Sequence, residues 1–368
     1  MTVLDQTGKR RLVPSATALP DPFAVRDEVD AILADFLAKR ARAAPGPEMT
    51  PLFTTLSGLL DGGKRLRAHL CVAGWYAGGG CGDRDLILRV AASLELFHAF
   101  ALIHDDVMDG SDLRRGRPTA HHALAAAYVA DGGPPHRATA HGQAAGLLLG
   151  DLVLTLSDDL IHTGPGAEAM WRIRPLLETM RSQLVYGQYL DLLSTGRPCD
   201  DVEAALRIVR YKTASYTVEW PLRIGAALVG AGPGVHSACS EFAIPLGEAF
   251  QLRDDLLGVF GDPAKTGKPV DDDIREGKAT VLMALALQPA SATDRQLLRE
   301  AVGNPDLTGE DFGRVRDVIE RSGAHRQVET MITARRHAAL TVLDQAPFPF
   351  LAAEALREIA GTATVRQS

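Results

Sequence analysis

The apolar and polar positions of this 368-residue chain alternate with a helical period almost throughout. Between residues 25 and 37, apolar side chains recur every three or four positions, which predicts an amphipathic helix. The same spacing predicts a short helix ending at residue 60, four helices in about the last 90 residues, and long helices over about 84–109, 139–162, 168–195, 200–230 and 235–260. We therefore expect about 13 to 14 helices and no convincing strand.

The composition favours an all-α protein with one large core. The chain is 46% hydrophobic but only 5% aromatic, and its long segments are rich in Ala and Leu. No linker rich in Pro, Gly and Ser divides it. We therefore expect a single large helical bundle over residues 21–368, preceded by a disordered tail over residues 1–20.

Charge and hydropathy exclude several functional classes. The net charge of −7 argues against a general nucleic-acid-binding surface. The longest apolar stretch, residues 144–156, is too short to span a membrane and is interrupted by Asp151. With no secretory signal pattern, we expect a soluble, cytoplasmic protein. We expect free thiols, rather than a disulfide or metal pair, at Cys71, Cys81, Cys199 and Cys239.

The first segment with candidate chemistry is Asp105-Asp106-Val107-Met108-Asp109. In a helix, Asp105 and Asp109 share one face with Cβ atoms about 5–6 Å apart. Two unscreened carboxylates at that distance repel each other by roughly 3 kcal/mol at an effective dielectric of 20. A cation is therefore expected between them, and Mg²⁺ fits oxygen-only ligands. The alternative, a solvated helix end, is disfavoured because apolar residues precede Asp105 and Asp106.

A second acidic pair, Asp254-Asp255, lies far along the chain in another apolar helix. This motif is asymmetric, because the position four residues after Asp254 is Gly258. On a third helix, Gln188 and Asp191 lie at i,i+3 on one face, where they can support a metal site directly or through hydrogen bonds. Two acidic faces looking at each other would form a cage for a Mg²⁺-diphosphate.

Residues 62–67, Gly-Gly-Lys-Arg-Leu-Arg, place a glycine turn before the start of a basic helix. Backbone N–H groups and the helix dipole favour an anion at such a position. Lys64 and Arg67 lie at i,i+3, so both can grip a diphosphate without a metal.

Further cations alternate with the acidic motifs. Arg114 and Arg115 follow the first motif by one short loop, and arginine binds phosphate in a bidentate manner. Lys212 and Lys268 lie in the segments Tyr-Lys-Thr-Ala and Thr-Gly-Lys-Pro. His98 stands two helical turns before the first aspartate, where it can contact a phosphate, although a lone helical histidine is more often a packed core residue. Each alone would be an ordinary residue, but the set indicates phosphate binding.

Taken together and in order, these segments resemble the trans-isoprenyl diphosphate synthases (the polyprenyl synthetase family), and among them the geranylgeranyl diphosphate synthases. The resemblance covers about residues 25–360. It is carried by G-G-K-R-L-R (62–67), H-D-D-V-M-D (104–109), R-R-G-R-P-T (114–119), G-Q-Y-L-D-L (187–192), Y-K-T-A (211–214), Q-L-R-D-D-L-L-G-V-F-G-D (251–262), T-G-K-P (266–269) and E-G-K-A-T (276–280).

The resemblance implies a homodimer of all-α subunits, each folded around a central cavity, and a role for each matching residue. Isopentenyl diphosphate would be bound by Lys64, Arg65, Arg67, His98 and Arg115. Three Mg²⁺ ions would be held by Asp105, Asp109 and Asp254, with support from Asp106, Gln188, Asp191 and Asp255. The allylic diphosphate would also contact Arg114, Lys212, Lys268 and Lys278. The reacting centre would be lined by Thr213 and Gln251.

The implied reaction is ionisation of the allylic diphosphate, attack by the isopentenyl double bond and loss of a proton to the released diphosphate. The chain-length residues would be Phe97, Phe100 and Ala101, and one bulky residue beside a small one resembles the pattern for a C20 product, geranylgeranyl diphosphate. Alternatives are a farnesyl diphosphate synthase, a class I terpene cyclase and a non-catalytic partner subunit. The cyclase is disfavoured because its second metal motif is missing and residues 62–67 would have no role. The partner subunit is disfavoured because both acidic motifs are retained.

Overall fold

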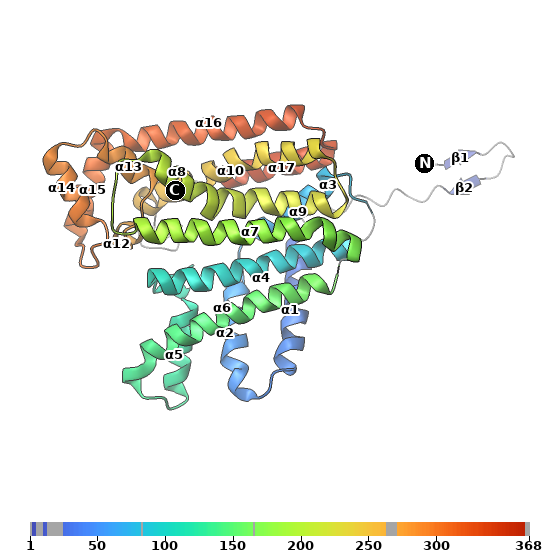
Figure 1. Cartoon of the computed structure of the whole chain (residues 1–368), viewed down its shortest axis with the longest axis horizontal. Helices are drawn as coiled ribbons and strands as arrows, with labels where there is room; N and C mark the ends of the chain where they lie inside the picture. Colours follow the sequence, from blue (N-terminus) through green and yellow to red (C-terminus); the bar gives the residue numbers. More distant parts are fainter. Residues whose placement is uncertain are drawn as a thin grey trace.

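The computed structural model describes residues 2–4, 10–12, 25–81, 84–164, 166–262 and 271–364. Nearly all of its regular structure is helical, which confirms the expected all-α class (Figure 1). The first helices are α1 (Val25–Arg42), η1 (Pro47–Met49), α2 (Thr50–Leu60), α3 (Leu66–Ala77), α4 (Arg84–Asp109), α5 (Ala120–Ala130), η2 (Pro135–Arg137), α6 (Ala138–His162), α7 (Ala167–Ser194) and α8 (Val202–Ile208). After them come η3 (Val209–Glu219), α9 (Trp220–Leu228), α10 (Pro233–Phe260), α12 (Asp272–Arg275), α13 (Val281–Leu287), α14 (Ala292–Ala301), α15 (Gly309–Ser322), α16 (Ala324–Gln345) and α17 (Phe350–Thr364).

The long helices fall where the apolar period predicts them. α4 has the predicted bounds, and α6, α7 and α10 differ from prediction by no more than one or two residues at each end. Three helix predictions need correction. The last 90 residues, as far as the structure describes them, contain five helices, α13 to α17, instead of the expected four. The single helix expected over 200–230 is divided into α8, η3 and α9, and α5 was not predicted, because its alanine-rich sequence has no clear apolar stripe.

Two short hairpins correct the expectation of no strand. β1 (Thr2–Leu4) pairs antiparallel with β2 (Arg10–Leu12), and β3 (Leu113–Arg114) pairs with β4 (Arg117–Pro118). Strands of two or three residues are too short to produce a readable alternation. Most of the tail expected over residues 1–20 lies outside the described residues, so both its disorder and the boundary at residue 21 stay predictions.

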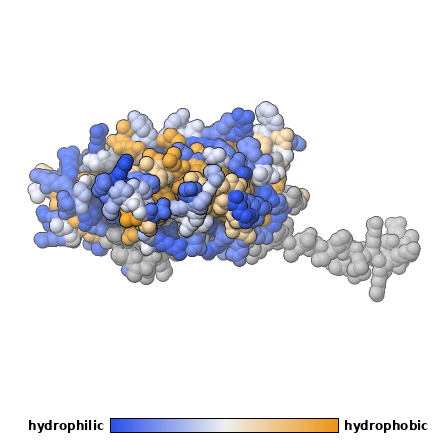
Figure 2. Space-filling model, turned by 90° about the horizontal axis from the view of Figure 1, so that it is seen from below, coloured by the Kyte–Doolittle hydropathy of each residue, from blue (hydrophilic) through white to orange (hydrophobic). Residues whose placement is uncertain are grey.

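The fold places α4 in the largest hydrophobic cluster. It packs against α1, α3 and α6, while α10 packs against η3 and α16. Figure 1 shows α7 crossing the molecule above α4, with α5 and α2 below and α12–α15 gathered at one end. Seen from below, hydrophobic surface gathers near the middle of a mostly hydrophilic face (Figure 2).

The only helix in the described ranges with the length and hydropathy of a membrane span is α4, and 67% of the most apolar window is buried inside the fold. Its apolar character therefore has an explanation in the core of the protein. The four cysteines are all free, as expected: Cys71 and Cys239 are buried, and Cys81 and Cys199 are exposed.

Candidate active site

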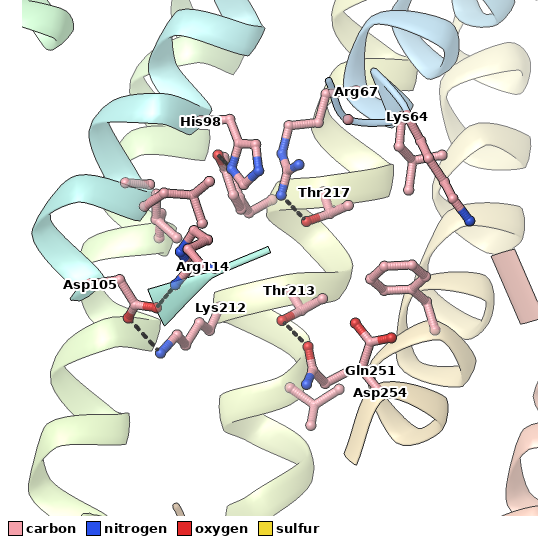
Figure 3. Close-up of a pocket in the computed structure, with 18 of the residues that line it drawn as sticks. Lys64, Arg67, His98, Asp105, Arg114, Lys212, Thr213, Thr217, Gln251 and Asp254 are labelled. Atoms are coloured by element: carbon pink, nitrogen blue, oxygen red, sulfur yellow. Dashed lines mark hydrogen bonds and ion pairs between the residues drawn. The ribbon is translucent and has the colours of Figure 1, made fainter. Parts of the chain in front are cut away.

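A cavity of about 1120 Å³ opens between α3, α4, α7, η3 and α10. Residues predicted from distant parts of the sequence line it together: Lys64, Arg65, Arg67, His98, Ala101, Asp105, Arg114, Arg115, Gln188, Asp191, Lys212, Thr213, Gln251, Asp254, Asp255 and Lys278. Figure 3 shows Asp105 and Asp254 on opposite sides of this cavity, with Lys64, Arg67 and His98 grouped at one end. Lys268 lies outside the described residues.

Lysine side chains neutralise the first acidic motif. Asp105 accepts hydrogen bonds from Lys212 Nζ at 3.0 Å and from Gln188 Nε2 at 2.9 Å. Lys278 Nζ lies 3.2 Å from the carboxylate of Asp109. These ammonium groups sit at the acidic face where the sequence predicts a cation.

The second acid of this motif has a different position. Asp106 is 1% exposed and forms hydrogen bonds with the guanidinium group of Arg114. Its carboxylate therefore orients Arg114 beside the cavity, whereas Asp105 faces the cavity itself.

The electrostatics of this face follow from burial and from the paired charges. Burial alone would raise the pKa of Asp105, but Lys212 and Lys278 lower it below its ordinary value. The pKa of Asp109 is raised, because burial and the neighbouring Asp105 outweigh the attraction of Lys278. The pKa of Lys212 is raised despite burial, since Asp105 and Asp191 surround its ammonium group. Lys212 therefore stays charged at neutral pH.

The second acidic motif stands at the C-terminal end of α10. Asp254 lines the cavity, and the buried Asp255 accepts a hydrogen bond from Gln251 Nε2 at 2.8 Å. Burial raises the pKa of Asp255 to about 8. The hydroxyl group of Thr213 donates to Gln251 Oε1 at 2.8 Å, which joins η3 to α10 across the cavity wall.

The structure explains the glycine in the second motif. A Cβ atom at Gly258 would collide with a carboxylate oxygen of Asp273, which comes from α12. Asp273 also lines the cavity. An acidic side chain therefore reaches this part of the cavity from α12, although position 258 itself has none.

α7 brings the third acidic contributor close to η3. Asp191 is buried, and its carboxylate lies 2.6 Å from Lys212 Nζ. This approach requires a glycine at position 187, because a Cβ atom there would lie only 2.5 Å from the backbone nitrogen of Lys212. The glycine of the Gly-Gln-Tyr-Leu-Asp segment therefore sets the distance between the two helices.

The opposite end of the cavity is cationic. Arg67 donates from Nη2 to Thr217 Oγ1 at 2.7 Å, while its buried Nε has no hydrogen-bond partner in the structure. Burial and the neighbouring Arg114 lower the pKa of Arg115. Within the described residues, neither Arg67 nor Arg115 contacts a carboxylate. Such a cluster of arginines favours binding of an anion.

Backbone conformation marks the same end of the cavity. Among the described residues, only Arg65 and Arg115 combine a side chain with positive φ, at +48° and +53°. Such conformations are costly for residues with a Cβ atom and cluster at functional sites. Gly63 is also left-handed, and a Cβ atom there would lie 3.0 Å from the Arg115 guanidinium group. The turn and this arginine are therefore packed together.

Arg65 differs from the other cations of this end. The sequence resemblance suggests that Arg65 binds the substrate. In the structure, the nearly buried side chain of Arg65 forms an ion pair with Asp30 at 2.6 Å and lies 3.7 Å from Glu95. Glu95 also accepts a hydrogen bond from the backbone N–H of Ala68 at 3.1 Å. Arg65 and Glu95 therefore hold the start of α3 in place rather than facing an anion directly.

The candidate chain-length residues separate into two groups. Ala101 lines the cavity together with Leu102, whereas Phe97 and Phe100 do not. Phe97 is buried and contacts the rings of Phe100 and Tyr216, with centroids 5.3 Å and 5.8 Å apart. These two phenylalanines therefore pack behind the lining of the cavity.

Sequence reasoning missed several contributors to the site. Tyr216 and Thr217 contact His98 and Arg67, and Glu276 accepts a hydrogen bond from the Ser111 hydroxyl group at 2.8 Å. A weak signal existed for Asp273, which lies in the run Asp271-Asp272-Asp273 just before Lys278. Tyr216 and Thr217 carry no charge, and the π-helical backbone hides which way they point.

The described residues contain no group of three or more His, Cys, Asp or Glu side chains arranged to hold a metal ion. The carboxylates of the two acidic motifs nevertheless form an oxygen-only donor set on two sides of one cavity, which is the ligand chemistry of Mg²⁺. The residues present therefore fit Mg²⁺, provided that Lys212 and Lys278 release their carboxylates.

An all-α fold around a cavity with one carboxylate side and one arginine side has the chemistry of a helical enzyme that binds anionic substrates together with Mg²⁺. Residues 51–319 match the family model described as polyprenyl synthetase. The chain therefore belongs to the polyprenyl synthetase family, and the protein is a trans-prenyltransferase. The sequence resemblance to this family is confirmed.

Individual relatives agree with this assignment. The chain is 33% identical to a geranylfarnesyl diphosphate synthase of Aeropyrum pernix, over 78% of this chain and 84% of that protein. It is 32% identical to a geranylgeranyl diphosphate synthase of Mycobacterium tuberculosis, over 86% and 91%. A crystal structure of geranylgeranyl pyrophosphate synthase from Corynebacterium glutamicum, complexed with isoprenyl diphosphate and magnesium, superposes with a TM-score of 0.88 at 38% identity, covering 94% and 98% of the two chains.

Proposed function

We propose that the protein joins isopentenyl diphosphate head-to-tail (1′-4) to an allylic diphosphate and makes geranylgeranyl diphosphate as its main product. The observation that carries this proposal is the division of one cavity into two charged sides. One side combines carboxylates with lysines, and the other holds Arg67 and Arg115, which contact no carboxylate among the described residues. Two diphosphates would bind side by side, one through Mg²⁺ at the carboxylates and the other directly through the arginines.

Isopentenyl diphosphate would bind at the arginine side. Lys64, Arg67 and Arg115 supply positive charge there, and His98 lines the same end of the cavity. The buried, unpartnered Nε of Arg67 supports this assignment, because a buried donor without an acceptor is costly. A diphosphate oxygen would supply the acceptor.

The allylic diphosphate would bind at the carboxylate side. Arg114, Lys212 and Lys278 would hold its oxygens, and Lys212 already stands between Asp105 and Asp191. Mg²⁺, three ions in our proposal, would be held by Asp105, Asp109 and Asp254, with Gln188, Asp191, Asp106 and Asp255 in supporting positions. Bound Mg²⁺ would supply the positive charge that stabilises a departing diphosphate.

The residues between the two sides would guide the carbon chemistry. The hydrogen bond between Thr213 and Gln251 supports this role, because the two neutral side-chain oxygens would lie near the point where an allylic cation forms. The electron pair of the isopentenyl double bond would form the new carbon–carbon bond, and the proton lost would pass to the released diphosphate. Exclusion of water from the cavity during the reaction would protect the cation.

A C20 product is supported by the residues below Asp105. Ala101 and Leu102 on α4 and Leu184 on α7 line the cavity, and Phe97 packs one helical turn below Ala101. Two of the relatives are geranylgeranyl diphosphate synthases, although another makes geranylfarnesyl diphosphate. We propose that Phe97 and Phe100 support this end of the cavity from behind.

We also propose that the protein is a homodimer. α7 turns one face to the cavity and presents an apolar face to solvent, and α6 has two exposed leucines. Apolar surface of this extent on neighbouring turns marks protein interfaces. The residues concerned are Leu147, Leu148, Val185, Tyr186, Tyr189, Leu192 and Leu193.

The test is a product assay. The purified protein is incubated with Mg²⁺, labelled isopentenyl diphosphate and a C5, C10 or C15 allylic starter, and the dephosphorylated alcohols are separated by carbon number. A C20 alcohol is the expected result, and Ala101→Phe is expected to shorten it. A C15 stop would replace the C20 assignment with farnesyl diphosphate. Absence of elongation with every starter would overturn the synthase proposal and favour a cyclase or partner subunit.

A further inference from the structure

Three residues from separate elements meet at the arginine end of the cavity. The hydroxyl group of Tyr216, on η3, lies 3.1 Å from Nδ1 of His98, on α4. The guanidinium group of Arg67, on α3, stacks over the Tyr216 ring at 4.5 Å from its centroid. Tyr216 therefore touches two of the side chains that would face the proposed isopentenyl diphosphate, His98 and Arg67 (Figure 3).

The imidazole of His98 is neutral at physiological pH. Burial lowers its pKa well below the ordinary value, and Arg67, Arg114, Arg115 and Arg65 lower it further. Tyr216 keeps its proton, because burial raises its pKa to about 12. A neutral imidazole has one N–H donor and one bare nitrogen, so the tautomer decides which group faces the ligand.

The two tautomers have opposite effects on an anion. Among the described residues, Nε2 of His98 has no hydrogen-bond partner, and it is not sealed from solvent. With hydrogen on Nε2, this nitrogen donates to an anionic oxygen. With hydrogen on Nδ1, it presents a lone pair that repels the same oxygen. The hydroxyl group of Tyr216 distinguishes the two states, because it can donate only to a bare Nδ1.

We propose that Tyr216 is a positioning residue: it donates its hydroxyl hydrogen to Nδ1 of His98, fixes the tautomer with hydrogen on Nε2, and so presents an N–H donor to the metal-free diphosphate. The proposal rests on the proposed function for the identity of that ligand. The contact of the Tyr216 ring with Arg67 makes the same tyrosine hold a second ligand in place.

The tautomer is measured directly by NMR of protein labelled with ¹⁵N-histidine, in which bare and protonated ring nitrogens have distinct shifts. The His98 signals are assigned by their loss in His98→Gln. We expect a bare Nδ1 in the unmodified protein and a mixture of tautomers in Tyr216→Phe. Hydrogen on Nδ1 in the unmodified protein, or an unchanged signal in Tyr216→Phe, would overturn the proposal.

Binding of isopentenyl diphosphate in EDTA, measured by calorimetry, gives the functional effect. We expect Tyr216→Phe to weaken this binding about tenfold. The His98 imidazole is no longer oriented in the variant, which affects one charge-assisted hydrogen bond to the diphosphate. Tyr128→Phe is the matched control, since the Tyr128 ring also contacts a histidine ring, that of His141, but Tyr128 lies outside the cavity. An equal loss in both variants would contradict a specific role.

A double-mutant cycle separates positioning from general damage to the fold. In the His98→Gln background, Tyr216→Phe is expected to add little further loss of binding, because the group it positions is gone. A full additional loss there would refute the proposal. Failure of the unmodified protein to bind isopentenyl diphosphate would refute the proposed ligand, while the NMR result would still decide the tautomer.

Discussion

At the scale of single residues, Lys212 and Lys278 reduce the repulsion that the sequence predicts between the carboxylates of the first acidic motif. Each ammonium group contacts one carboxylate of that motif, at 3.0 Å and 3.2 Å. The prediction of positive charge beside these carboxylates therefore followed from their mutual repulsion, which the two lysines offset in the structure. The contacts of Lys212 and Lys278 with these carboxylates were not predicted, because the two lysines come from elements far along the chain.

Replacement of Lys212 by methionine tests this role. The change keeps an unbranched chain but removes the charge that contacts Asp105 and the proposed allylic diphosphate. We expect kcat/KM for the allylic substrate to fall by about 10²–10³-fold, while metal-free binding of isopentenyl diphosphate stays unchanged. Steady-state kinetics and calorimetry measure the two effects. Lys39→Met, at an exposed pair with Asp35, is the control, and an equal loss there would contradict the assignment.

His98 makes the stability of the protein depend on pH with a defined sign. Burial and Arg67 hold its pKa well below 6.5 in the folded state, so the unfolded chain binds this proton more readily. The contribution of His98 to the free energy of unfolding is therefore complete above about pH 6.5, and it is lost as the pH falls towards the folded-state pKa. Each tenfold difference in proton affinity between the folded and unfolded chains contributes about 1.4 kcal/mol.

The corresponding variant is His98→Gln. Between pH 7.5 and 5, we expect Tm to fall more for the unmodified protein than for His98→Gln, because glutamine does not titrate. Thermal unfolding followed by circular dichroism measures both. Parallel pH profiles would show that His98 is not held neutral by the fold.

At the scale of elements, η3 determines how the cavity wall is built. Its π-helical backbone carries Lys212, Thr213, Tyr216 and Thr217 to the cavity, and π-helical turns are frequent at functional sites. Gly187 on α7 permits the close approach of this element. The site therefore depends on a backbone contact as well as on its charged side chains.

Gly187→Ala is expected to push η3 away from α7. The added methyl group would lie 2.5 Å from a backbone nitrogen that cannot rotate aside. We expect a destabilisation of about 1–3 kcal/mol and a clear loss of activity, measured by denaturant unfolding and product formation. Gly313→Ala on α15 has open space around it and is expected to be neutral or slightly stabilising. Equal behaviour of the two variants would contradict the packing argument.

The same elements show what sequence reasoning can reach. The charged motifs were identifiable because a buried aspartate or a run of arginines is costly without a ligand or partner. The long helices were identifiable because their apolar period repeats over many turns. The π-helical form of η3 was hidden, since two or three wide turns differ little from an α-helical period, and so were its uncharged contributors Tyr216 and Thr217. The burial of Arg65 against Asp30 and Glu95 depends on tertiary contacts that no local pattern reveals.

At the scale of the whole molecule, α7 connects the cavity to the outer surface. Leu184, Gln188 and Asp191 face the cavity, and Tyr186 and Tyr189 are 63% and 62% exposed on the other side. If this outer face is the dimer interface, the wall of the active site is also the wall between two subunits.

The double variant Tyr186→Glu, Tyr189→Glu tests the homodimer. Two buried charges at an apolar interface without partners are costly, so we expect a monomer where the unmodified protein is a dimer. Size-exclusion chromatography with light scattering measures the mass. Trp171→Glu is the control, because Trp171 is 76% exposed near the other end of the same helix. If the unmodified protein is itself a monomer in solution, the homodimer proposal is wrong.

The lysine–aspartate pairs also have a consequence for the order in which ligands bind. Each ammonium group is a tethered competitor, present beside its carboxylate at a high effective concentration. Mg²⁺ added alone therefore has to displace it, whereas a diphosphate gives the lysine a new anion to contact. Metal and diphosphate affinities should rise together by the same factor, because such coupling is reciprocal. Calorimetry of Mg²⁺ with and without pyrophosphate would measure that factor, and the enzyme would respond to the joint supply of metal and substrate rather than to either alone.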